Sequence, residues 1–247
     1  MNWEREIQQL LEREADLSLV ALERLAVRSH APNWRGVCSD GRSVVVKLVP
    51  QKVRLARVDD PLAPQDLFPD REFRLGDRRI YVLDWKDGVA KSLDELTVNE
   101  LEAFVSVYAA FCRTLGEGRI HGDFNCNNVL FSQQKVSGIL DLEAVREGHP
   151  CEDWVRYTLT GVEHLPVFAC RRRRRAIEQF ARLVSLTDFP VAAWRRAVEG
   201  FAAARRRRKM KRGRLTLFRR VNLAWRERFY RQLIDRITHG GAEYGKG

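Results

Sequence analysis

The sequence lacks the features of an exported or membrane-spanning protein. None of its apolar runs approaches the roughly 20 residues that cross a bilayer. Its first residues, Met1–Glu6, are polar and charged, and they lack the apolar core of a signal peptide. We therefore expect a cytoplasmic protein.

Paired cysteines are also lacking. The five cysteines are odd in number, scattered and free of any CxxC spacing: Cys38, Cys112, Cys126, Cys151 and Cys170. This excludes a disulfide framework or a zinc site built on cysteine pairs, and it predicts reduced thiols.

Negative charge is in short supply as well, and the net charge is +11. Two basic blocks, Arg171–Arg175 and Arg205–Arg214, contribute much of the excess. A strongly basic chain attracts nucleic acid, an anionic membrane face, or a phosphorylated or acidic substrate. The alternative is that both blocks are solvated helix ends and a basic linker.

The pattern of apolar residues predicts strands early and helices late. We expect an amphipathic helix over 3–26 that could break near Ala15–Asp16, and a hairpin over 34–49 that turns at Asp40-Gly41. Residues 51–79 contain three prolines and predict loop and short helix, and residues 79–85 predict a strand. The further predicted elements are a helix from 98 to 115, strands at 128–132 and 136–142, and helices at 152–160, 173–186, 190–204 and 214–238.

This order of elements predicts an α+β protein with two lobes. We expect a small strand-rich N-lobe over residues 1–86 and a larger helical C-lobe over residues 87–247.

The chain has one dense group of polar residues that could take part in catalysis, within Ile120–Phe131 and Gly138–Glu143. Asp123 and Asn128 share a short loop, and Asp141 interrupts an apolar strand where a carboxylate needs a cation. In phosphoryl transfer one Asp accepts or orients a hydroxyl proton, while an Asn and a second Asp hold Mg²⁺. The alternative is that the asparagines are turn residues and Asp123 is a cap.

Two further residues extend this hypothesis. Lys47 lies inside an apolar strand, where its ammonium must reach an anion or water. His121 could be a general base or a metal ligand, but we interpret it as a hydrogen-bonded scaffold residue because Asp123 already supplies a carboxylate.

His121-Gly122-Asp123 with Asn128, followed by Asp141-Leu142-Glu143, resembles the motifs of the aminoglycoside phosphotransferase and choline kinase superfamily. The resemblance is strong over 119–160 and rests on layout over 34–118. It implies a protein-kinase-like fold and an ATP- and Mg²⁺-dependent phosphotransferase (kinase) that acts on a hydroxyl of a small molecule.

The resemblance also implies roles for individual residues. Asp123 resembles the catalytic base, and Asp153 is similar to the Asp that buttresses the catalytic loop. The implied metal ligands are Asn128, Asp141 and Glu143. The implied nucleotide-binding residues are Lys47 at the phosphates and Tyr81–Trp85 beside the adenine. No partner for Lys47 is evident from the motifs, and Glu72 is our candidate.

One family feature is missing, because no glycine-rich phosphate loop precedes Lys47. A kinase fold that has lost catalysis and serves as a scaffold is therefore one alternative. Another is a nucleic-acid-binding protein, although it would leave Asp123, Asp141 and Glu143 without a role, and we do not expect nucleic acid as a partner.

The acceptor is a separate question. A lipid-linked or phosphorylated sugar suits the positive charge, as in lipopolysaccharide core sugar kinases. In that case Arg205–Arg214 would contact anionic lipid at the inner membrane face.

Overall fold

A computed structural model describes residues 3–25, 32–163, 165–166, 169–210 and 217–239. Side chains are described in the same ranges, except at 208–210, 217–225 and 239. The chain divides into two compact units: residues 1–87 with 138–143 form the first, and residues 88–137 with 144–247 form the second. The N-lobe had been predicted to end at residue 86. The short segment Gly138–Glu143 belongs to the first unit although residues on both sides of it belong to the second.

An antiparallel sheet forms the first unit, in the order β1-β2-β3-β5-β4. Its strands are β1 (Leu19–Arg24), β2 (Asn33–Cys38), β3 (Ser43–Pro50), β4 (Phe73–Leu75) and β5 (Arg78–Asp84). Asp40-Gly41 turns the β2–β3 hairpin as predicted, with Gly41 at φ 84°. The β-branched run in β3 lies between two strands, where side chains of this shape pack well on a pleated surface.

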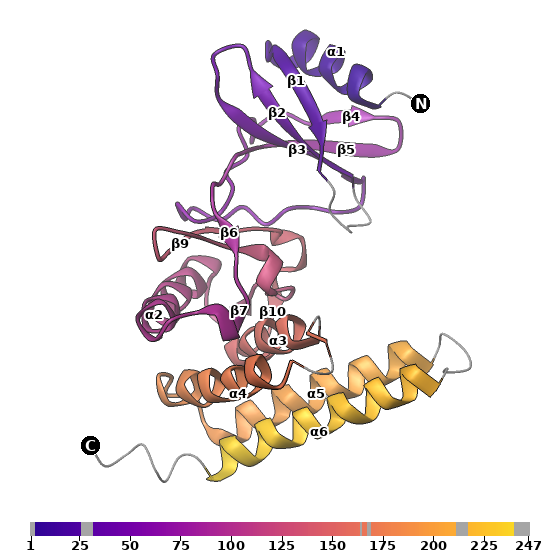
Figure 1. Cartoon of the computed structure of the whole chain (residues 1–247). Coiled ribbons are helices and arrows are strands. Elements are labelled where there is room, and N and C mark those ends of the chain that lie inside the picture. The colour runs from indigo at the N-terminus through magenta and orange to yellow at the C-terminus, as the bar shows by residue number, and fades with distance from the viewer. Residues whose placement is uncertain (1–2, 26–31, 164, 167–168, 211–216, 240–247) are drawn as a thin grey trace. The chain divides into compact units, whose positions relative to one another are not determined.

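Helix α1 (Trp3–Ala15) packs against β1 and β4 of this sheet (Figure 1). Its buried residues recur at helical spacing: Ile7, Leu10, Leu11 and Ala15. The indole N–H of Trp34 on β2 donates a hydrogen bond of 2.9 Å to Glu4 Oε1, which fixes the helix over the sheet.

Two predictions in this unit are wrong in part. The helix predicted over 3–26 ends at Ala15, at the break expected near Ala15–Asp16, where Asp16 adopts a left-handed conformation at φ 54°. The residues after the break form β1, paired with β2, and not helix. The segment 51–79, expected to be loop and short helix, contains the short strand β4 instead. In both places pairing with a neighbouring strand decides the local conformation, and helical periodicity cannot report such pairing.

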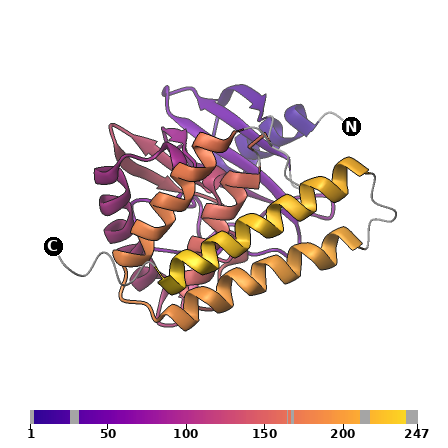
Figure 2. The ribbon, with the colours of Figure 1, turned by 60° about the horizontal axis from the view of Figure 1, so that its bottom comes forward.

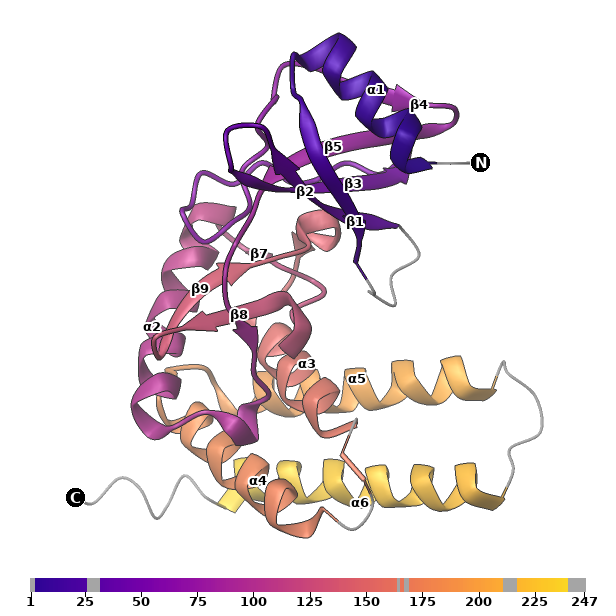
Figure 3. The same cartoon turned by 45° about the horizontal axis from the view of Figure 1, so that its top comes forward.

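The second unit begins with β6 (Val89–Ala90), the 3₁₀ helix η1 (Leu93–Glu95) and α2 (Val98–Leu115). Thr97 and Glu100 form a capping box that begins α2, and Gly116 at φ 98° ends it. Next come β7 (Arg119–Ile120), η2 (Cys126–Asn128), β8 (Val129–Ser132), β9 (Lys135–Ile139), η3 (Leu142–Ala144) and β10 (Arg146–Glu147). β10 pairs with β7, and β6, β8 and β9 form a three-stranded sheet beside α2 (Figure 3).

Helices make up the rest of the second unit: α3 (Pro150–Glu163), α4 (Cys170–Ser185), α5 (Val191–Met210) and α6 (Leu217–His239). α5 and α6 run side by side in opposite directions, drawn in orange and yellow in Figure 2. α3 packs on α5 and α4 packs on α6. Among the helices of the described ranges, none is long and apolar enough to span a membrane.

Most of the first basic block on α4 is held by acidic and carbonyl groups of the same unit. Arg172 pairs with Asp94 and Glu95, and Arg174 pairs with Glu178. In the second block Arg205 pairs with Glu163, while residues 211–216 lie outside the described part of the chain.

Candidate active site

The carboxylate of Asp153 holds the loop that carries Asp123. Asp153 lies in the first turn of α3 and is buried. It accepts hydrogen bonds from the backbone N–H groups of His121 (2.7 Å) and Gly122 (3.0 Å) and from the hydroxyl of Tyr108 (2.6 Å). Burial raises the pKa of Asp153, while these three donors stabilise its ionised form. Asp153 therefore occupies the buttressing position that the sequence resemblance implied.

Gly122 permits the turn that precedes Asp123. It has φ 79°, and a β-carbon at this position would collide with the carbonyl oxygen of Ala144. After this turn the backbone N–H of Asp123 donates to Nδ1 of His121 (3.3 Å). His121 is fully buried, and its role as a scaffold residue stays a prediction.

Two asparagines secure the other end of the loop. The side-chain amides of Asn125 and Asn128 donate to the carbonyl oxygen of Asp123 at 3.0 and 2.9 Å. Asn125 also caps η2 by accepting from the backbone N–H of Asn127 (3.0 Å). Both side-chain amides therefore hold the backbone carbonyl of Asp123 in place.

An aromatic cluster lies beneath the loop. Phe124 is fully buried, with its ring centroid 4.4 Å from that of Tyr108 and 5.6 Å from that of Tyr157. Rings in such contact contribute packing energy beyond the area they bury. Phe124 points into the core, so the neighbouring Asp123 is left half-exposed at the loop surface.

In the first unit, Lys47 on β3 is buried and forms ion pairs with Asp141 and Glu143. Its Nζ lies 2.5 Å from Oε1 of Glu143. Burial disfavours the ammonium, but the two carboxylates outweigh burial and raise the pKa of Lys47 above its ordinary value. Asp141 has φ 71°, a conformation that non-glycine residues rarely adopt and that is concentrated at functional sites.

Glu72 does not pair with Lys47, contrary to the sequence prediction. Glu72 instead pairs with Arg74 and with Arg79 on β5. Arg79 is buried, and a buried guanidinium needs a carboxylate. Trp85 is partly buried and donates its indole N–H to Asp87 (2.8 Å), while the Arg35 guanidinium lies 4.8 Å from its ring centroid.

A cavity of about 560 Å³ adjoins this ion-pair group. Glu72 lines it, as do Lys47, Asp141, Arg79, Tyr81 and Leu83, and all of these residues belong to the first unit. Trp85 is not among the lining residues.

The oxygen donors expected for Mg²⁺ are present. Asp141 and Glu143 supply carboxylates in the first unit, and Asn128 supplies an amide oxygen in the second. The described residues contain no group of three or more His, Cys, Asp or Glu side chains arranged to hold a metal unaided. Mg²⁺ commonly binds through one or two carboxylates together with substrate phosphates, so Asp141 and Glu143 of the first unit fit an ion that arrives with its nucleotide.

A second cavity, of about 690 Å³, adjoins Asp123 in the second unit. Asp123 itself lines it, together with residues of β10, α3 and α5. Oδ1 of Asp123 lies 3.2 Å from Nη1 of Arg156, one turn after Asp153 on α3. The sequence reasoning did not select Arg156, although its spacing from Asp153 places both on one side of the helix.

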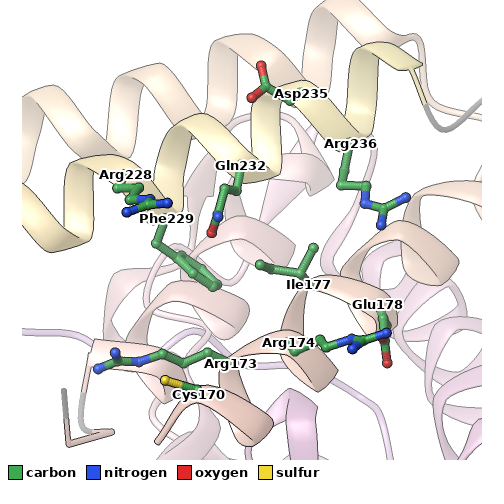
Figure 4. A pocket seen from close by; sticks show the side chains of 10 residues that line it. All are labelled: Cys170, Arg173, Arg174, Ile177, Glu178, Arg228, Phe229, Gln232, Asp235 and Arg236. Atoms are coloured by element: carbon green, nitrogen blue, oxygen red, sulfur yellow. The ribbon is translucent and has the colours of Figure 1, made fainter. Parts of the chain in front are cut away.

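Figure 4 shows a further cavity, of about 610 Å³, between α4 and α6. Its apolar surface comes from Ile177 and Phe229, and arginines of both helices surround it: Arg173, Arg174, Arg228 and Arg236. No residue predicted to act in catalysis lines this cavity.

Comparison with known proteins gives the same family as the motifs. A model described as the phosphotransferase enzyme family matches residues 6–169. The structure of aminoglycoside phosphotransferase APH(4)-Ia with AMP-PNP and hygromycin B is similar, with a TM-score of 0.59 and 12% identity, over 94% of this chain and 98% of that one. APH(3'')-Id from Streptomyces rimosus, in complex with ADP and streptomycin, has a TM-score of 0.50 and 15% identity, over 96% of this chain and 99% of that one. A search of curated proteins found no match to this sequence.

The fold and the loop around Asp123 define a phosphotransferase of the protein-kinase-like class. The chain belongs to the phosphotransferase enzyme family. It is an ATP-dependent phosphotransferase that acts on a hydroxyl group. The predicted family, fold class and enzyme class are thereby confirmed, and the expected cofactors, ATP and Mg²⁺, are those of this family.

Proposed function

We propose that this phosphotransferase transfers the γ-phosphoryl group of ATP to a small hydroxyl compound that binds in the cavity beside Asp123. The observation that carries the proposal is the anchored loop. Asp153 holds its N-terminal end, Asn125 and Asn128 hold its C-terminal end, and the side chain of Asp123 faces a cavity of about 690 Å³. A carboxylate fixed in this way beside open space suits a catalytic base.

In the proposed reaction Asp123 accepts the proton of the acceptor hydroxyl. The acceptor oxygen forms a bond to the γ-phosphorus as the bond to the bridging oxygen of ADP breaks. His121 and Asp153 keep the loop in position and take no part in proton transfer. Most of the rate enhancement comes from positioning and from charge neutralisation, as is general for phosphoryl transfer.

The nucleotide phosphates would bind at Lys47, which is already charged and buried in the first unit. Mg²⁺, when bound, would neutralise phosphate charge, and Asp141, Glu143 and Asn128 are the residues proposed to hold it. Trp85 and Glu72 remain predicted nucleotide-site residues. Because Glu72 pairs with Arg79, we propose for it an indirect role that keeps Arg79 in the cavity wall.

The test is an Asp123→Asn variant assayed with Mg-ATP against amino-alcohols, aminoglycosides and core sugars. We expect turnover to fall by about a hundredfold or more, because a general base contributes about that much or more. Thermal stabilisation by Mg-ATP should stay unchanged, because Asp123 is not among the residues proposed to hold the nucleotide or Mg²⁺.

The matched control is Asp188→Asn, the same chemical change at an exposed position of the second unit. Full turnover in Asp123→Asn would remove the catalytic assignment. A protein that neither binds Mg-ATP nor phosphorylates any acceptor would instead be a scaffold.

The second candidate is a kinase for lipid-linked or core sugars at the inner membrane face. The observation in its favour is the arginine content of the cavity beside Asp123. Membrane contact through Arg205–Arg214 remains a prediction, because only part of that segment is described. A lipid-linked sugar belongs in the same turnover panel and decides between the two candidates.

A further inference from the structure

The cavity beside Asp123 has more positive than negative side chains in its wall. Asp123 and Glu152 are its two acidic lining residues. Its four arginines are Arg146, Arg156, Arg196 and Arg205. Arginine stays protonated in proteins, so four guanidiniums face two carboxylates. Glu163, which does not line the cavity, pairs with Arg205, so the net excess is one positive charge.

Both carboxylates are already engaged. Glu152 Oε2 lies 2.7 Å from Nη2 of Arg146, and Asp123 Oδ1 lies 3.2 Å from Nη1 of Arg156. A cationic acceptor would therefore meet no unpaired carboxylate in the cavity wall. It would also have to approach Arg196 against the charge of its guanidinium.

Arg196 differs from the other three arginines of the cavity wall in its lack of a partner among the described residues. Within the described part of the chain, it forms no hydrogen bond or ion pair. Its exposed neighbour Arg195 pairs with Glu199 at 2.9 Å, one turn further along α5. A guanidinium presents five donors in a planar fork that matches phosphate and carboxylate oxygens.

Two other arginines are held in place around one aromatic ring. The guanidinium carbons of Arg156 and Arg205 lie 5.9 and 5.4 Å from the ring centroid of Phe201. Arg205 also pairs with Glu163, a largely buried carboxylate that contacts Tyr230. These contacts limit the freedom of the two side chains, so less entropy is lost when an anion binds.

We propose that the acceptor carries an anionic group of its own, a phosphate or a carboxylate, in addition to the hydroxyl that is phosphorylated. The anion binds Arg196 and Arg156, while the hydroxyl lies at Asp123. Arg156 then exchanges the Asp123 carboxylate for the anion of the acceptor, which frees Oδ1 to accept the proton. This inference rests on the proposed function, because it names the substrate class of the same cavity.

A charge series on one sugar ring tests the proposal. The probes are glucosamine, glucose, glucuronate and glucose 6-phosphate. Binding is measured by calorimetry without nucleotide, and phosphorylation is measured separately with Mg-ATP. We expect both to be strongest for the two anions and weakest for the amine. The preference should shrink between about 0.05 M and about 0.5 M salt, because screening weakens exposed charge interactions.

The variants are Arg196→Gln and, as the matched control, Arg195→Gln on the same helix. Both side chains are exposed, so both variants should fold. Arg196→Gln should weaken binding of the anionic probes by about tenfold or more and leave glucose unaffected, because hydrogen bonds to charged groups are worth about that much. Arg195→Gln should change neither.

The binding and turnover results separate the two proposals. The anionic acceptor is supported if the anionic probes bind most tightly and Arg196→Gln removes this preference, even if no probe is phosphorylated. In that case only the proposed function would be in question. Preference for glucosamine would overturn the inference while leaving a phosphotransferase in place. Equal effects of Arg196→Gln and Arg195→Gln, or binding without charge dependence, would overturn it as well.

Discussion

At the scale of single residues, the Asp153 carboxylate joins three parts of the second unit. Its two oxygens accept from two backbone N–H groups and one hydroxyl, and all three donors lie in or next to the buried core. The same carboxylate thus joins α2, the loop before Asp123 and α3. If a side chain with an N–H group replaced this carboxylate, that N–H group would face one of the three donors, and neither would have an acceptor.

We therefore expect Asp153→Asn to lower the free energy of unfolding by about 3 kcal/mol, because its NH₂ group must face one of these donors. Urea unfolding would measure the loss. Glu152→Gln is the control: the partly exposed pair of Glu152 with Arg146 is worth about 1 kcal/mol or less, and a glutamine oxygen can still accept from the backbone N–H of His149 (3.2 Å). Equal losses in the two variants would show that Asp153 does not hold the loop.

Lys47 illustrates what one residue in a sequence can and cannot reveal. An ammonium in an apolar strand predicts an anionic partner. It does not say which anion, because the partners Asp141 and Glu143 are more than ninety residues away. The position of Glu72 in the sequence made it a candidate for this partner, but Glu72 forms its ion pair with Arg79 on β5.

At the scale of elements, α5 presents a glycine to the cavity beside Asp123. Gly200 lies inside this 20-residue helix, and no atom lies within 4 Å of where its β-carbon would be. Glycine inside a helix lowers the free energy of unfolding relative to alanine. The open space beside Gly200 means that a larger side chain would fit there without a collision.

Gly200→Ala should raise the free energy of unfolding by about 0.5–1 kcal/mol, because alanine restricts the unfolded chain and forms helix more readily. Gly200→Leu should fill part of the cavity and raise KM for the acceptor, while Mg-ATP binding stays the same. Ala192→Leu, an exposed change on the same helix outside the cavity, is the control for KM. If Gly200→Leu left acceptor kinetics unchanged, the cavity would not be the acceptor site.

Element boundaries were predicted unevenly. The hairpin at Asp40-Gly41 and helix α2 follow the sequence closely, because a turn signal and a capping box are encoded locally. The strand β1 was predicted as helix, since Leu19, Val20 and Leu22 fit helical spacing as well as a strand. Only the neighbouring strand β2 decides between the two.

Across the whole molecule, the cysteine thiols differ in burial, so their reactivity depends on whether the two units are folded. Cys38, Cys126 and Cys151 are buried, and Cys112 is partly buried. Burial raises the pKa of Cys112 to about 11 and that of Cys151 to about 12. Cys170 at the start of α4 is exposed.

We expect one thiol to react rapidly with a disulfide reagent at pH 8 in the native protein, because the reactive species is the thiolate and needs access to reagent. All five should react in denaturant. Cys170→Ser should remove the rapid phase, and Cys112→Ser is the matched control that should keep it. A rapid phase of several thiols would contradict the burial described for the native units.

The sequence by itself determined the reaction class. His121, Asp123, Asn128, Asp141 and Glu143 lie within one short stretch, so their spacing is legible without a structure. It also determined the main local elements, because turn residues, caps and apolar spacing act over a few neighbours. The absence of paired cysteines and of long apolar runs was equally visible.

Only the tertiary structure decided what each charged group contacts. It assigned Asp141 and Glu143 to Lys47, placed Arg156 at Asp123 and left Arg196 unpaired in the described part of the cavity wall. These contacts join residues distant in sequence, and the energy of an ion pair depends on separation and burial rather than on order along the chain. The sequence showed that the protein is rich in arginine, whereas folding decided which arginines face the acceptor cavity.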